Sequence, residues 1–131
     1  MKKDGLQLDE LQKILEKWKK FFQLDDWIIS LKVTEFKRKD FKQSGDIKID
    51  LKNKKVKILI TNKPFRNEES TIVHELIHLL LWKYDMFSEK IILKNCAKYK
   101  GDHKQYLVEL EDTVAKLTVI FLNMDKKRVN I

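Results

Sequence analysis

The sequence has little cysteine, glycine or proline: one, three and one among 131 residues. Because a disulfide needs two thiols, Cys96 forms none within the chain, and a zinc site made of several thiolates is excluded. Cys96 is expected to pack as a small hydrophobic residue, with zinc ligation beside histidine as the alternative. Since no Gly- or Pro-rich linker interrupts the chain, we expect one domain over residues 1–131, with a charged tail at 126–131.

Long hydrophobic runs and arginines are also scarce. No uninterrupted apolar segment approaches the ~20 residues that cross a bilayer, and no signal-peptide core follows the first residues. We therefore expect a cytoplasmic protein without a membrane partner. The net charge is +8, but only three of the 28 basic residues are arginines, the residue that contacts phosphates and bases in bidentate fashion. This balance favours a solvated lysine surface over nucleic-acid binding, which stays the alternative.

The first half of the chain predicts one helix and three strands. Apolar residues recur at helical spacing over residues 6–22. Apolar and polar residues then alternate from Trp27 to Val33, and again over 45–51 and 56–60, which is the period of half-buried strands. Asn53-Lys54 between the last two segments predicts the turn of a β-hairpin.

The second half is predicted to be helical. Thr71–Trp82 is apolar nearly all round, as in a helix buried in a core, and Asn67 is its expected N-cap. Residues 103–122 predict a long final helix, whereas 86–99 fit no single pattern. Helix, three strands, helix, loop and helix together indicate an α+β fold with helices on one face of a small sheet.

The predicted core helix contains His74-Glu75-Leu76-Ile77-His78. His74 and His78 are four residues apart, so their rings project from one helix face and can bind a single zinc ion. Glu75 lies about 100° around the helix from His74, where it can reach a zinc-activated water without being a ligand. The pattern predicts peptide hydrolysis with Glu75 as general base. Two histidines held by ordinary hydrogen bonds are the alternative, which the cost of burying three such groups disfavours.

A catalytic zinc site needs a third protein ligand. The metzincin pattern would place Gly at 81 and His at 84, where this chain has Leu81 and Tyr84, so the ligand must come from farther along. On a helical wheel Glu111 falls in the middle of an apolar arc, which comprises Leu107, Leu110, Val114, Leu117, Thr118 and Phe121. A carboxylate buried there needs a cation. We expect zinc, with a lysine at the edge of the arc as the alternative.

His103 lies on the same arc, about two turns before Glu111. It is a second candidate for the third ligand. It is also a candidate catalytic residue that donates a hydrogen bond to the oxyanion of the tetrahedral intermediate, or it has no role beside Asp102. Weaker candidates for the oxyanion donor are Tyr84, Tyr99 and Tyr106.

With these residues the chain resembles small zinc metallopeptidases of phages and prophages. The similar segments are Leu24-Asp25-Asp26-Trp27, Glu69 to Leu80, and Glu111 to Leu117. The resemblance implies a minimal zincin-like domain of gluzincin type, with zinc on His74, His78 and Glu111 and with Glu75 catalytic. The distantly similar SprT-like proteases have a third histidine after the motif, which keeps His103 as an alternative ligand. The family names no substrate.

Two functions follow as expectations. The first is a zinc metallopeptidase that acts on a protein or peptide substrate in the cytoplasm, for which cleavage of a repressor is one version. The second is a zinc-containing binding module without proteolysis, whose basic surface recognises nucleic acid or a protein partner.

Overall fold

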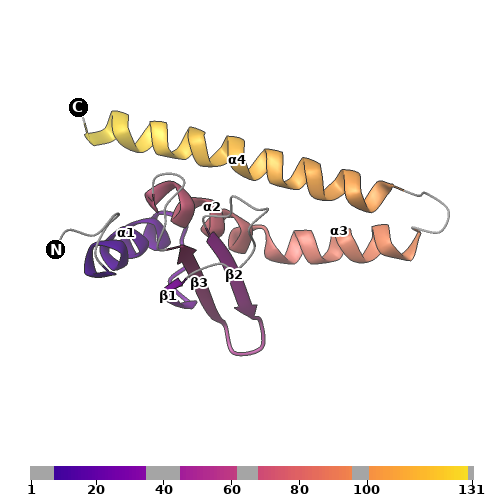
Figure 1. Ribbon diagram of the computed structural model, residues 1–131, viewed down its shortest axis with the longest axis horizontal. Helices are drawn as coiled ribbons and strands as arrows, with labels where there is room; N and C mark the ends of the chain where they lie inside the picture. Colours follow the sequence, from indigo (N-terminus) through magenta and orange to yellow (C-terminus); the bar gives the residue numbers. More distant parts are fainter. Residues whose placement is uncertain (1–7, 35–44, 62–67, 96–100, 130–131) are drawn as a thin grey trace. The chain divides into compact units, whose positions relative to one another are not determined.

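The computed structural model describes residues 8–34, 45–61, 68–95 and 101–129. It is an α+β fold, as expected (Figure 1). The elements in chain order are α1 (Leu8–Phe21), β1 (Ile28–Thr34), β2 (Gly45–Asp50), β3 (Lys55–Thr61), α2 (Glu68–Leu80), α3 (Trp82–Lys94) and α4 (Asp102–Val129). The chain divides into two compact units, residues 1–76 and 77–131, and the boundary falls inside α2.

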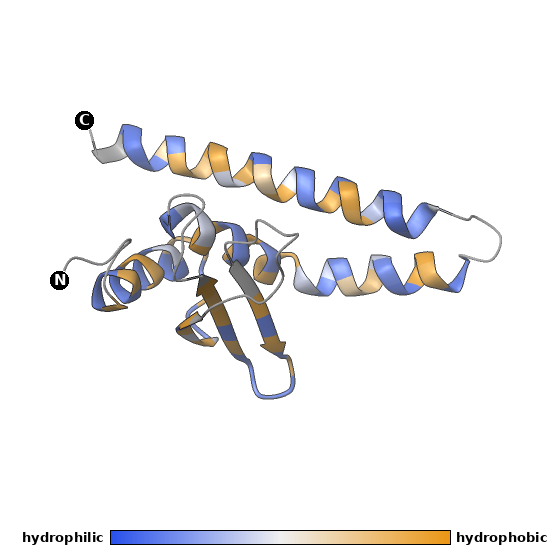
Figure 2. Cartoon of the chain, in the orientation of Figure 1, coloured by the Kyte–Doolittle hydropathy of each residue, from blue (hydrophilic) through white to orange (hydrophobic). Residues whose placement is uncertain are grey.

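The sheet of the first unit has the strand order β1-β3-β2, so β3 is the central strand. β3 pairs in parallel with β1 and antiparallel with β2, which confirms the predicted hairpin. Hydrophobic and hydrophilic residues alternate along β3 (Figure 2), and Val56, Ile58 and Ile60 are its buried members. In the hairpin turn Lys54 has a left-handed backbone with φ 53°, and the Asp50 carboxylate accepts hydrogen bonds from Asn53.

Helix α1 contributes three buried residues, Leu11, Leu15 and Trp18, to the core of the first unit. Trp18 also donates a hydrogen bond from Nε1 to Oε2 of Glu69 at 2.7 Å, and Lys17 lies 3.4 Å from the same oxygen. Hydrogen bonds to charged groups are stronger than neutral ones. The indole of α1 therefore holds the first turn of α2, the helix that carries the two motif histidines.

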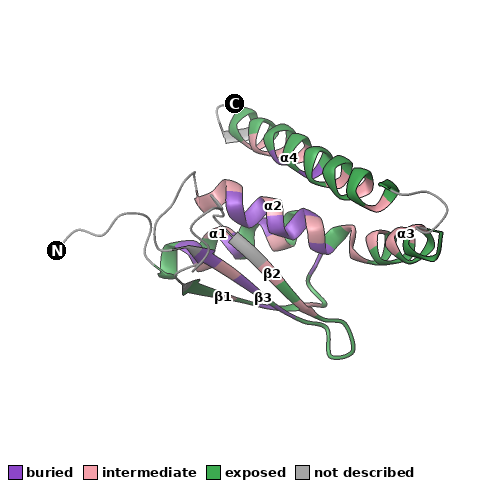
Figure 3. Cartoon of the chain, turned by 45° about the vertical axis from the view of Figure 1, so that its right-hand side comes forward, coloured by how far each residue is buried: buried purple, intermediate pink, exposed green. Residues whose placement is uncertain are grey.

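Helix α2 is buried on several sides, as its nearly uninterrupted apolar sequence predicts. Ile72, Val73 and Leu76 are each 0% exposed (Figure 3). Helix α2 ends at Leu80, two residues before the predicted end at Trp82, and α3 begins at Trp82. Of the segment 86–99, which fits no single pattern, residues 86–94 belong to α3. No residue of α3 is buried, so it lacks the apolar stripe that would have identified a helix in the sequence.

Two polar contacts join α3 to α4 in the second unit. The hydroxyl of Tyr106 donates a hydrogen bond to Oδ1 of Asp85 at 2.5 Å, and Nε2 of His103 lies 2.8 Å from Oε2 of Glu89. Asp85 and Glu89 are four residues apart, so they lie on one face of α3. Side-chain polar groups thus join the start of α4 to α3.

Helix α4 is longer than predicted, because it continues to Val129. Residues 126–129 are therefore helical, which corrects the expected charged tail over that part. Gly101, with φ +93°, precedes the helix, and its carbonyl accepts the amide hydrogen bond of Gln105. Although α4 has 28 residues, none of the described helices combines the length and apolar character needed to cross a membrane.

The contact between Tyr106 and Asp85 predicts a pH dependence of stability. Burial, together with the hydrogen bond to Asp85, raises the pKa of Tyr106 above its ordinary value of 10.0. Because the unfolded chain loses this proton at lower pH than the folded chain, the contribution of Tyr106 to folding stability is constant below about pH 10 and falls above it. The Tyr106→Phe variant is expected to lose this component. Thermal melts of both proteins between about pH 8 and 11 check it, and parallel pH curves would contradict it.

Candidate metal centre

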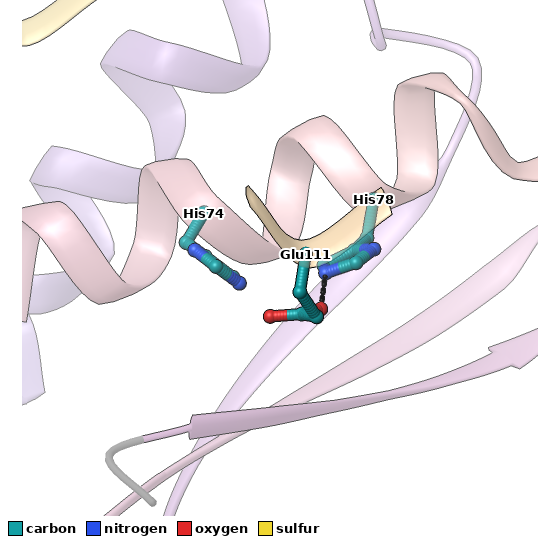
Figure 4. Close-up of side chains that lie close together, drawn as sticks. All are labelled: His74, His78 and Glu111. Atoms are coloured by element: carbon teal, nitrogen blue, oxygen red, sulfur yellow. Dashed lines mark ion pairs between the residues drawn. The ribbon is translucent and has the colours of Figure 1, made fainter. Parts of the chain in front are cut away.

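Helix α2 places His74 and His78 one turn apart on the same side of the helix (Figure 4). This arrangement follows directly from the four-residue spacing in a continuous helix. The His78 side chain is 16% exposed, and Nδ1 of His74 is buried.

Helix α4 adds a carboxylate to this pair. Oε1 of Glu111 lies 2.6 Å from Nε2 of His78, the contact drawn as a dashed line in Figure 4. His78 is thus a described partner of Glu111. The expectation that Glu111 is buried was wrong, since its side chain is 59% exposed. Val114 and Thr118 are the buried members of the predicted arc, and both lie farther along α4.

The three side chains together form a set of metal ligands. One ligand atom from each of His74, His78 and Glu111 lies within 4.8 Å of the other two. Two ligands of a tetrahedral zinc ion are about 3.3 Å apart, given bonds of about 2.0–2.1 Å. Shifts of about an ångström therefore bring all three onto one ion, and the chemistry of the set, two imidazoles and a carboxylate, suits zinc. Three protein ligands leave a fourth position open, as catalytic sites require.

Glu75 lies next to His74 in the sequence but is not part of the ligand set. Glu75 is only 7% exposed, and its neighbours on α2 are mostly apolar. A carboxylate buried in this way is costly for a helix unless it serves a purpose or has a partner. The role of Glu75 as general base stays a prediction.

The structure does not bring His103 to the ligand set. His103 lies in the first turn of α4, eight residues before Glu111, which is about 12 Å along the helix axis. Its Nε2 instead contacts Glu89. The contact between His103 and Glu89 was not predicted, because no helix was predicted at α3. Asp85 and Glu89 are four residues apart, and this helical spacing was the available signal.

Of the other candidates for an oxyanion donor, Tyr84 and Tyr106 are not brought to the ligand set. Tyr84 is 70% exposed on α3, and the hydroxyl of Tyr106 is bonded to Asp85. Tyr99, Cys96 and the expected N-cap Asn67 lie outside the described residues. Among the three tryptophans, Trp18 is fully buried, while Trp27 and Trp82 are partly exposed.

Comparisons with protein-family models, curated proteins and solved structures find no match for this chain. The function is therefore argued from the geometry and chemistry of the side chains.

Proposed function

We propose that the protein is a zinc-dependent metallopeptidase that hydrolyses peptide bonds of protein or peptide substrates in the cytoplasm. The observation that carries the proposal is the proximity of ligand atoms from His74, His78 and Glu111. Two of these residues follow from the helical motif, and the third comes from a helix more than thirty residues farther along the chain. Independent segments thus supply one ligand set.

Each residue has a role in the proposed reaction. His74 and His78 offer neutral ring nitrogens, and Glu111 offers a carboxylate that partly neutralises a divalent cation. Zinc, when bound, supplies a Lewis acid that activates water and polarises the scissile carbonyl. Glu75 accepts a proton from the attacking water and returns it to the leaving amine. His103 has no role here, because it is bonded to Glu89 well along α4 from the ligand set.

Metal content and metal-dependent hydrolysis test the proposal directly. The protein purified without chelators is expected to contain about one zinc per chain and to cleave an unstructured protein such as casein. Treatment with a chelator should stop cleavage and lower the melting temperature, because a ligand present at 100 times its Kd stabilises the folded state by about 2.7 kcal/mol. Zinc-free protein that neither binds added zinc nor melts higher with it would refute the proposed function.

A further inference from the structure

The outer face of the sheet, opposite the buried residues of β3, carries an unusual concentration of lysines. Strand alternation and the pairing register place on it the exposed residues Lys32 of β1, Lys48 of β2, and Lys55 and Lys57 of β3. We call these four residues the lysine face. It belongs entirely to the first unit, and it contains no residue of the metal centre.

Lys48 and Lys57 stand directly opposite each other in the antiparallel pair β2–β3. Like charges at directly opposed positions destabilise a sheet. The remaining strand β1 brings Ser30 to the same row, beside Lys57. Among the described side chains, no carboxylate forms an ion pair with Lys48 or Lys57. The repulsion is therefore not relieved within the described part of the protein.

Strand alternation places two acidic residues of β2, Asp46 and Asp50, on the same face as the four lysines. Asp50 is paired with Lys55 in the register, but its two oxygens accept hydrogen bonds from the side chain and backbone of Asn53. These bonds, led by that of the Asn53 side chain, lower the pKa of Asp50. Asp50 thus stabilises the hairpin turn and leaves the face with an excess of positive charge.

The face is also hollowed. An open depression of about 370 Å³ lies over β1, β3 and β2. It is lined by Ile28, Ser30, Lys48, Ile49, Asp50, Lys55, Val56 and Lys57. Ile28, which is 63% exposed, gives the depression an apolar wall beside the charged groups. A depression of this size holds a planar group such as a nucleobase.

We infer that the lysine face binds single-stranded nucleic acid, with lysines on the phosphates and a base in the depression. Lysine is a point charge that contacts phosphates without fixed geometry, so the binding is independent of sequence. Three strands give a face roughly 10 Å across, wide enough for one backbone. A duplex would keep its bases stacked inside and away from the depression. This inference does not depend on the proposed peptidase activity.

Fluorescence anisotropy with the full chain and a labelled oligothymidylate of about 20 nucleotides tests the inference. If about three phosphates are neutralised, the logarithm of the binding constant falls with the logarithm of salt concentration with a slope of about −2. The variant Lys48→Gln/Lys57→Gln should reduce that slope to about −0.7 and weaken binding on the order of 50-fold at about 50 mM salt. It should not lose stability, because the substitution removes a repulsive pair.

The matched control is Lys13→Gln/Lys90→Gln, which removes two exposed lysines from α1 and α3. It should retain most of the affinity and the salt slope. Equal losses in both double variants, or no binding by the unmodified chain at low salt, would overturn the inference. So would tighter binding of duplex DNA of equal length, or of a polyglutamate peptide, than of the single strand.

Discussion

Replacing His78 by alanine is expected to weaken zinc binding more than about 100-fold, because residues that only support a ligand already contribute about 10–100-fold. His78 is the member of the ligand set that contacts Glu111, at 2.6 Å. Its loss removes one nitrogen donor and also the group that holds the carboxylate near the site. Zinc affinity measured by competition with a chromophoric chelator gives the result directly.

His103→Ala is the matched control for this substitution. His103 is a histidine of the same chain, but its Nε2 contacts Glu89 and not the ligand set. The His103→Ala protein should therefore keep the zinc affinity of the unmodified chain, whereas Glu111→Gln should weaken it. If His103→Ala lost zinc and Glu111→Gln did not, the third ligand would be His103, and the proposed ligand set with Glu111 would be wrong.

The sequence was most informative where a regular pattern and a buried environment coincide. Alternating apolar residues identified β3 and the hairpin, because Val56, Ile58 and Ile60 are all buried on one face. The pairing of β1 was not predictable in the same way. Whether β1 pairs with β3 in parallel depends on the path of the chain between the two strands, and the alternation of apolar residues within a strand gives no information on that path.

The helices show the same limit. α2 was evident because it is apolar on all sides, whereas α3 was missed because none of its residues is buried. Without a buried stripe, the periodic signal that identifies a helix is absent. The end of α4 was placed too early for a similar reason, since Lys126 and Lys127 near its end are charged and exposed.

The metal centre was predictable in its residues but not in its environment. The spacing of His74 and His78 gives their shared helix face without any tertiary information. The helical wheel gave Glu111 and His103 as candidates on α4, and Glu111 is the one whose ligand atom lies near the two histidines. It wrongly predicted burial, because a wheel assigns a residue to a face but cannot tell how far a neighbouring element covers that face.

Replacing Glu75 by glutamine is expected to lower the rate of peptide hydrolysis by about 10²–10⁴-fold while zinc stays bound. Glutamine has nearly the shape of glutamate but cannot accept the proton of the attacking water. Since Glu75 is not part of the ligand set, zinc content should stay at the value of the unmodified protein. The rate of cleavage of a fluorogenic peptide, measured beside metal content, separates the two effects.

Glu109→Gln, which changes an exposed carboxylate of α4 in the same way, is the control and should leave the rate unchanged. Glu75 is 7% exposed, so melting curves of both variants are recorded beside the rates, and rates are compared only between proteins that are folded at the assay temperature. A loss of rate in the Glu75→Gln protein would then report chemistry and not unfolding. If the unmodified chain bound zinc but hydrolysed nothing, and Glu75→Gln changed only stability, the metal would be structural and the protein a binding module.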